Sequence, residues 1–181
     1  MDDTGAVPGH HEQMRSDELR EIQRPLKESY RETPEAALVV LRATGQLGEG
    51  VSCSIETGRQ LVQAGLHRST GGTGMQACSG DMLLQALVAC AGVTLQAVAT
   101  SLELDVRGGR LTAEADFDAR GTLGVDREAP VGLQNVRLDF AIEGELTEPE
   151  LEKLLALTER YCVVLQTLRS SPQVTASMRV A

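Results

Sequence analysis

The sequence predicts an α+β protein in which antiparallel sheets wrap around one long buried helix. Strands and helices fall into separate runs along the chain, which is typical of α+β folds. Several short segments alternate apolar and polar residues, as strands with one buried face do. One segment, at about 80–102, is too long for a strand and is apolar on nearly all sides, which indicates a helix enclosed by protein.

Length and composition favour one globular domain. The chain has 181 residues, enough for a single core, and its core must come mainly from Leu, Val, Ala and Met because aromatic residues make up 2%. The net charge is -9, and no basic stripe is present. Nucleic-acid binding needs basic residues and usually aromatic stacking partners, so we expect no nucleic-acid partner.

Residues 1–35 are expected to form an N-terminal extension, and residues 36–181 the domain. The extension is polar and charged, with breaks expected at Pro25 and Pro34. Ser16 is a suitable N-cap for a short helix running toward residue 23. We expect a loose tail or an arm that clasps another subunit rather than a regulatory element. No secretory signal is visible, so a cytoplasmic protein with reduced thiols is expected.

The domain is expected to begin with strands. In the second of them Val51, Cys53 and Ile55 share one face, which makes Cys53 a core residue. The glycine-rich segment 65–80 lacks the Lys-Ser/Thr pair of a phosphate-binding loop, so we expect a flexible connection at a pocket rim. The expected strands are 38–44, 51–56 and 60–64, with a turn at 45–50.

The long apolar helix carries Cys90 near its middle. Small neighbours, Ala89, Ala91 and Gly92, allow another backbone to approach closely. Acidic flanks without a Lys/Arg clamp argue against a membrane span. A helix this apolar needs more cover than one small sheet supplies, so we expect a homodimer.

Further elements follow the helix. Thr147 and Glu150 have the spacing of a capping box, which predicts a helix start, and its apolar face carries Leu151, Leu154, Leu155 and Thr158. A short helix is expected from Cys162 to about residue 168. Alternating residues predict strands at 110–118, 135–143 and 174–180.

Cysteine chemistry is the main functional signal. The four cysteines form no C-x-x-C pair. Cys90 is either a packing residue or, if donors or a cation lie close, a reactive thiol. Cys162 is expected at a helix start, where unpaired N–H groups favour a thiolate, and Arg160 is near it in sequence. If folding brings the two thiols together, they could form a sulfenic acid and then a disulfide.

Competing chemistries have weaker support. Zinc ligands usually come in closely spaced pairs, and His10 and His11 are the only adjacent candidates, in the extension. A serine hydrolase is disfavoured because G-x-S-x-G is missing and His67 is the only histidine in the domain. We therefore expect no metal and no other cofactor.

Two motifs resemble the OsmC/Ohr family of osmotically induced and organic hydroperoxide resistance proteins. Residues 79–90 read S-G-D-M-L-L-Q-A-L-V-A-C, similar to the family's P-x-E-L-L-L-A-A-L-A-A-C. Residues 159–164 read E-R-Y-C-V-V, similar to its second motif, A-E-x-x-C-P-V. The resemblance extends over about 38–180 and favours the OsmC-like branch.

This resemblance implies an OsmC-like fold in an intertwined homodimer, with two sites at the interface. It implies a peroxidase in which Cys90 is the peroxidatic and Cys162 the resolving cysteine. The implied substrates are organic hydroperoxides or other small apolar molecules, reduced by thiols without metal or flavin.

The chain departs from the family pattern near the first cysteine. Gly80 stands where the hydroperoxide reductases carry a glutamate, and Leu47 falls near their arginine. Asp81, Arg160 and Arg42 are possible supporting residues, although Asp81 also suits a helix N-terminus. These departures keep open an OsmC-like protein that binds an apolar ligand with little peroxidase activity, or a structural dimer with cysteines that only pack.

Overall fold

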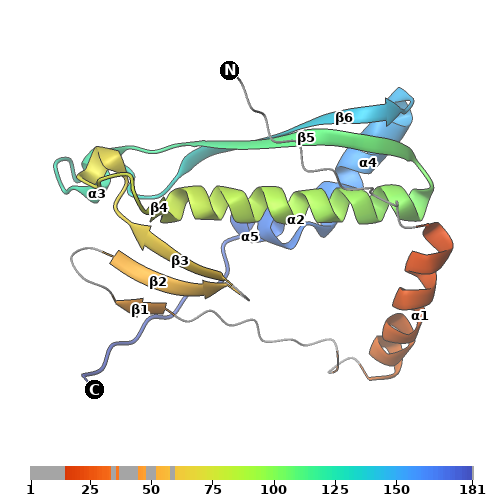
Figure 1. Cartoon of the computed structure of the whole chain (residues 1–181), viewed down its shortest axis with the longest axis horizontal. Coiled ribbons are helices and arrows are strands. Elements are labelled where there is room, and N and C mark those ends of the chain that lie inside the picture. Colours follow the sequence, from red (N-terminus) through yellow and green to blue (C-terminus); the bar gives the residue numbers. More distant parts are fainter. Residues whose placement is uncertain (1–14, 34–35, 37–44, 48–51, 58–59, 181) are drawn as a thin grey trace.

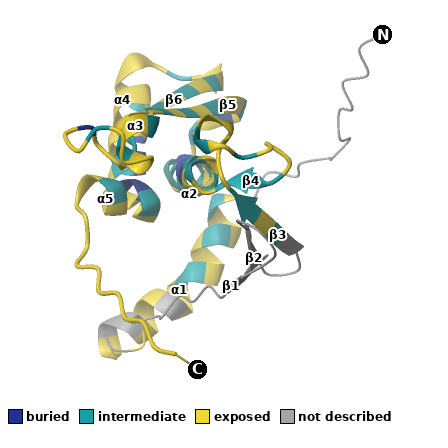
Figure 2. Cartoon of the chain, turned by 90° about the vertical axis from the view of Figure 1, so that its left-hand side faces the viewer, coloured by how far each residue is buried: buried dark blue, intermediate teal, exposed yellow. Residues whose placement is uncertain are grey.

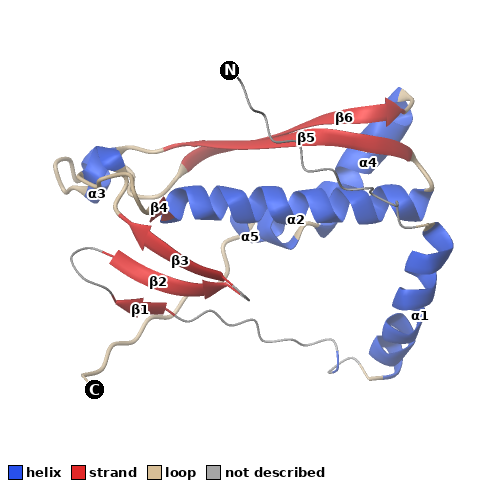
Figure 3. Ribbon diagram, in the orientation of Figure 1, coloured by secondary structure: helices blue, strands red, loops and turns tan. Residues whose placement is uncertain are grey.

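The computed structural model describes residues 15–33, 36, 45–47, 52–57 and 60–180. It is an α+β fold in which sheets pack along a long central helix, as expected (Figure 1, Figure 3). The elements are α1 (Ser16–Glu32), β1 (Gly45–Leu47), β2 (Ser52–Thr57), β3 (Gln60–Gly65), η2 (Arg68–Thr70), β4 (Ala77–Cys78), α2 (Ser79–Leu102), β5 (Asp105–Asp116), α3 (Ala119–Thr122), β6 (Gln134–Glu145), α4 (Glu148–Tyr161) and α5 (Val163–Arg169).

Helix α2 is the axis of the fold and confirms the long helix predicted at 80–102. Its buried residues recur every four positions, so they form one stripe, which faces β5, α4 and α5 (Figure 2). They are Leu87, Ala91, Leu95 and Ala99. Another face is open, and Val93 is 73% exposed. The described sheets and helices of the single chain bury one stripe, so the expected enclosure on nearly all sides stays a prediction that depends on a second subunit.

Strands β5 and β6 form an antiparallel pair that lies along α2 (Figure 3). Leu111 pairs with Phe140, and Ala113 with Leu138; all four are half-buried against the core. Both predicted strands are confirmed, but β5 begins earlier, at Asp105. A Cβ at Gly109 would lie 2.5 Å from a β6 carbonyl oxygen, and this close approach requires a glycine that interrupts the apolar alternation.

The smaller sheet has the order β1-β2-β3-β4. Strands β2 and β3 confirm the predicted strands near 51–56 and 60–64, while the strand expected at 38–44 lies outside the described residues. The prediction of a turn at 45–50 is wrong for its first three residues, because Gly45–Leu47 forms strand β1 and pairs with β2. The last pair, β3–β4, is parallel, so this sheet is not antiparallel throughout.

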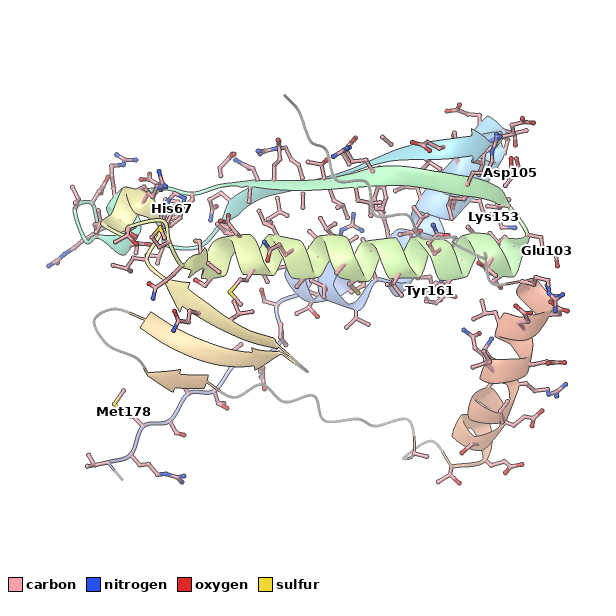
Figure 4. All side chains as sticks on the ribbon, in the orientation of Figure 1. His67, Glu103, Asp105, Lys153, Tyr161 and Met178 are labelled. Atoms are coloured by element: carbon pink, nitrogen blue, oxygen red, sulfur yellow. The ribbon has the colours of Figure 1, made fainter. Side chains whose placement is uncertain are left out.

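The C-terminal segment differs from the sequence prediction. Residues 171–180 form no strand, and Val174, Met178 and Val180 are exposed. Met178 is 100% exposed and stands clear of the rest of the chain (Figure 4). A strand needs a neighbour for its N–H and C=O groups, and this segment pairs with no described strand.

Helix α1 is longer than expected. It begins after Arg15, which rather than Ser16 is the N-cap, and it continues through Pro25 to Glu32. Proline has a backbone φ suited to a helix and removes one hydrogen bond, so an exposed helix need not end there. Arg20 reaches Glu103 at 3.1 Å, which joins α1 to the end of α2 (Figure 4).

The start of α4 is as predicted. The Thr147 N–H and hydroxyl donate to the Glu150 carboxylate at 2.8 and 2.7 Å, and these bonds lower the pKa of Glu150. The inward face of α4 carries buried Leu154 and Thr158, whereas Leu151 and Leu155 are exposed. The capping box therefore fixes where α4 begins, and the helix ends at Cys162.

We expect Leu154→Ala to lower the free energy of unfolding by about 3 kcal/mol, because it leaves a cavity in the core. Leu155→Ala is the matched control and should cost less than about 1 kcal/mol. Leu154 is 2% exposed and Leu155 is 46% exposed. Denaturant unfolding followed by circular dichroism measures both, and equal losses would contradict the described packing of α4.

Candidate active site

Two cysteines that are distant in sequence meet beneath α2. Cys90 lies in the middle of α2, and Cys162 lies between α4 and α5. They belong to one core cluster with Leu87, Ala91 and Leu165, and each thiol shifts the pKa of the other. Cys162 is 0% exposed, Cys90 is half-buried, and both are free thiols.

The corner between α4 and α5 places the second sulfur. Cys162 ends α4 and begins α5 in an extended conformation, with φ -71° and ψ 106°. Its N–H donates to Thr158 O, and its carbonyl accepts from Gln166 N–H, both at 2.9 Å. Arg169 binds the Glu159 carboxylate at 2.7 Å across the corner. These bonds fix the direction of α5 relative to α4, and α5 in turn packs against α2.

The start of α5 lowers the pKa of the Cys90 thiol. Burial alone would raise this pKa. The backbone N–H of Val164, the Cys162 thiol, the backbone N–H of Val163 and the Thr94 hydroxyl oppose burial, and together they bring the pKa below its ordinary value. A thiolate is thus favoured at Cys90 without a guanidinium in this set of donors.

The neighbouring thiol is shifted in the opposite direction. Burial raises the pKa of Cys162; the N–H groups of Leu165 and Val164 oppose this, and the nearby Cys90 adds to it. The backbone N–H groups at this helix start do lower the pKa of Cys162, as expected, but burial and the neighbouring Cys90 outweigh them and the net shift is upward. When the pair carries one negative charge, these opposite shifts favour placing it on Cys90.

A pocket of about 560 Å³ with mixed polar and apolar walls lies beside this pair. Four of its lining residues also pack in the cysteine cluster: Leu138, Phe140, Leu165 and Leu168. The ion-paired Glu159 and Arg169 contribute the charged part of its wall. Its size suits a small molecule with both apolar and polar parts.

Among the described residues, the other candidates do not contact the cysteines. Asp81 is exposed at the start of α2, about 13 Å along the helix axis from Cys90 at 1.5 Å per residue. Arg160 is exposed, and its guanidinium lies 5.6 Å from the Tyr161 ring centroid. Gly80 lies beside Asp81 in the first turn of α2. Arg42 lies outside the described residues.

The remaining cysteines lie elsewhere. Cys78 is the N-cap of α2 and lines a separate pocket of about 650 Å³ with His67. The backbone of Cys53 is in β2, but its side chain is outside the described set. Among the described residues, no cluster of three or more His, Cys, Asp or Glu side chains could hold a metal ion.

Sequence reasoning missed the donors to Cys90. Thr94 lies four residues after Cys90, a spacing that places it one turn away on the same helix face. The sequence predicted unpaired N–H groups at this helix start, but it predicted their effect on Cys162 and not on Cys90. Only the packing of α5 against α2 directs them to Cys90.

Comparison with known proteins gives the family. The profile of the family described as OsmC-like protein matches residues 72–177. This is more than half of the 181 residues, and the chain belongs to the OsmC-like protein family. Among curated proteins, no sequence matches it.

Solved structures show the same fold. An OsmC-like protein from Mycoplasma pneumoniae is 17% identical, with a TM-score of 0.62 over 74% of this chain and 89% of that one. An organic hydroperoxide resistance protein, OsmC, from Legionella pneumophila is 22% identical, with a TM-score of 0.59 over 74% and 92% of the two chains. An organic hydroperoxide resistance protein from Elizabethkingia anophelis is 19% identical, with a TM-score of 0.59 over 75% and 91%.

Helix α2 is long and apolar enough to cross a membrane, by length and composition alone. It lies inside the segment that matches the family, and its buried stripe packs on β5, α4 and α5. We therefore assign it to the interior of a soluble OsmC-like fold.

We expect Cys162→Ala to slow alkylation of Cys90 by iodoacetamide several-fold at pH 7. Loss of the Cys162 donor raises the pKa of Cys90, so less thiolate is present at a fixed pH. Cys162→Ser keeps a donor and should retain most of the rate. Peptide mass spectrometry separates Cys90 from Cys53 and Cys78, and an unchanged rate in Cys162→Ala would contradict the described donor.

Proposed function

We propose that this protein is a thiol-dependent peroxidase that reduces organic hydroperoxides through Cys90 and Cys162, in defence against oxidative stress. The observation that carries the proposal is the pair itself, with a half-exposed thiol of lowered pKa beside a buried thiol of raised pKa. The names of relatives as organic hydroperoxide resistance proteins add support.

The proposed reaction uses both sulfurs. The Cys90 thiolate attacks the outer oxygen of a hydroperoxide, the O–O bond breaks, and after proton transfer the products are an alcohol and the Cys90 sulfenic acid. The Cys162 thiol then attacks that sulfur, which forms a disulfide and releases water. Two equivalents of an external thiol reduce the disulfide and become a disulfide themselves.

Exposure decides where the external thiol attacks. Cys162 is 0% exposed, whereas Cys90 is half-buried and therefore within reach of solvent. The reductant accordingly forms its mixed disulfide at Cys90, and Cys162 is the leaving thiol. The leucine, valine and phenylalanine side chains in the pocket beside the pair support a hydroperoxide with an apolar body, and no cofactor enters the proposed cycle.

We propose that the working unit is an intertwined homodimer. Val93 on the open face of α2 and three apolar residues of the C-terminal segment lack cover in the single chain. Supporting roles for Asp81 and Arg160 require a second subunit, because neither contacts the thiols of its own chain. A supporting role for Arg42 stays a prediction.

The N-terminal part is proposed to be an extension, residues 1–35, that precedes an OsmC-like domain, residues 36–181. The matched family segment falls wholly within the proposed domain. We place the protein in the cytoplasm, where cellular thiols keep cysteines reduced.

A second candidate function is binding without turnover. It is favoured by the pocket beside the cysteines together with Gly80 and Leu47, which replace the residues typical of the hydroperoxide reductases. The protein would then hold a small apolar ligand beside thiols that react slowly with hydroperoxide.

We expect the reduced wild-type protein to consume cumene hydroperoxide in stopped-flow assays and to form a Cys90–Cys162 disulfide. Cys90→Ser should abolish consumption because it removes the attacking sulfur. Cys162→Ser should accumulate a Cys90 sulfenic acid that dimedone traps for mass spectrometry. Cys78→Ser is the control and should behave as wild type, while a wild-type protein that stays reduced in excess peroxide would favour the binding function.

We expect the wild-type protein to sediment as a dimer and Val93→Lys to shift it toward monomer, because a charge would enter an apolar interface. Thr112→Lys, at an exposed position of β5, is the control. Sedimentation velocity measures both variants. A monomeric wild type at micromolar concentration would overturn the dimer proposal.

A further inference from the structure

A second pocket lies at the start of α2, apart from the cysteine pair. Its volume is about 650 Å³, which is within the range of small-molecule sites. Its walls come from the segment around η2, the first turns of α2, the end of β5 and the segment before β6. His67 stands at this end of the fold (Figure 4). The pocket shares Leu133 with the one beside the cysteines, but neither Cys90 nor Cys162 lines it.

The walls of this second pocket are mainly apolar and incompletely covered. Leu66, Phe117 and Val131 line it, and these residues are 40%, 38% and 63% exposed. Leu84 and Leu133 are half-buried in the same walls. Apolar side chains gathered around a hollow lose contact with water when a molecule fills it, which favours binding.

One ring nitrogen of His67 is available to a ligand. Its Nδ1 atom accepts the Ser69 N–H at 3.1 Å and lies 2.6 Å from the Ser69 hydroxyl oxygen. A neutral imidazole that accepts at Nδ1 carries its hydrogen on Nε2. Among the described residues, none takes this Nε2 hydrogen, and the ring packs edge-on against Phe117 at 6.1 Å between centroids. The wall therefore offers a hydrogen-bond donor beside an aromatic side chain.

The charges of the lining favour an uncharged ligand. Asp81 is the acidic residue of these walls, and no lysine or arginine is among the described residues that line them. An anion would exchange water for apolar side chains and a carboxylate, without a cation to pair with. Asp81 is exposed, so water and salt weaken its attraction for a cation.

We propose that this pocket is a second binding site, for a small uncharged molecule that is mostly apolar and carries a hydroxyl or carbonyl oxygen. The apolar body packs against Phe117, Val131 and Leu133, and the oxygen accepts a hydrogen bond from His67. The site is independent of the proposed peroxidase, because neither thiol of the cysteine pair takes part in it.

Gly80 keeps one corner of this pocket open. A Cβ there would lie 3.6 Å from the Cys78 sulfur and 3.8 Å from a Leu133 methyl carbon, and both residues belong to the pocket wall. These are ordinary van der Waals distances, so a side chain would fit and a long one would extend into the pocket. Gly132 also lines the pocket, and a Cβ there would meet no atom within 4 Å. The two glycines therefore allow the pocket to be filled by substitution.

The test uses 2-naphthol as the uncharged probe and 2-naphthoate as an anion of similar shape. The chain contains no Trp, so naphthalene fluorescence reports binding to the reduced full-length protein against a low background. We expect 2-naphthol to bind and to slow alkylation of Cys78 by iodoacetamide several-fold, because Cys78 lines the pocket, while Cys90 reacts as before. Peptide mass spectrometry separates the two cysteines. 2-Naphthoate should bind about tenfold more weakly, since its carboxylate gains no cation.

Pocket-filling variants identify the site. Gly80→Leu and Gly132→Leu should each weaken 2-naphthol binding about tenfold, a loss of about 1.4 kcal/mol, because the new side chain takes the space of the probe. Ser171→Leu is the matched control, since Ser171 lines the pocket beside the cysteines and not this one. Its affinity should equal that of the wild type. Circular dichroism establishes that each variant is folded, and protection of Cys78 in the wild type decides the question if neither glycine variant folds.

Four results would overturn the proposal. Cys78 could react equally fast with and without 2-naphthol, Ser171→Leu could weaken binding as much as Gly80→Leu, or 2-naphthoate could bind as tightly as 2-naphthol. The fourth is a Cys78 that is unreactive without any probe, because a second subunit then covers the pocket. No hydroperoxide is added, so the failure of this site and the failure of the peroxidase are separate observations.

Discussion

The contact between the start of α5 and the middle of α2 is the constraint on which the candidate site depends. Backbone N–H groups in the first turn of a helix have no partner within that helix. Here two of them, from Val163 and Val164, face the sulfur of Cys90 and lower its pKa. The ion pair between Arg169 and Glu159 joins the far end of α5 to α4.

That contact also separates two chemically identical side chains. Cys90 receives donors from two helices and remains half-exposed, whereas Cys162 is buried beneath it. The pKa shifts therefore favour a charge on the more accessible sulfur and a proton on the enclosed one, which is the division that a peroxidatic and a resolving thiol require. Backbone amides, the Cys162 thiol and one hydroxyl produce the shift at Cys90, and no guanidinium of the described residues contributes to it.

Helix α2 explains both the successes and the errors of sequence-based prediction. Its length and apolar character gave its position to within one residue. The same apolar character indicated a helix enclosed on nearly all sides, yet Val93 is exposed in the single chain. An apolar helix surface predicts burial, but the sequence does not say whether the burying residues come from the same chain or from another. The segment that contains Val174 and Val180 alternates like a strand but has no partner strand in this chain.

The sequence by itself determined the α+β class, the long helix with Cys90, the capped helix that begins after Thr147, and the two motifs that indicated the family. These features depend on residues close together in the chain, where helix and strand periods and capping act locally. Only the tertiary structure decided that Cys162 lies against Cys90 and that N–H groups at the start of α5 act on Cys90 as well as on Cys162. The direction of a pKa shift depends on burial and on donors from another element, and both are set by packing between distant segments.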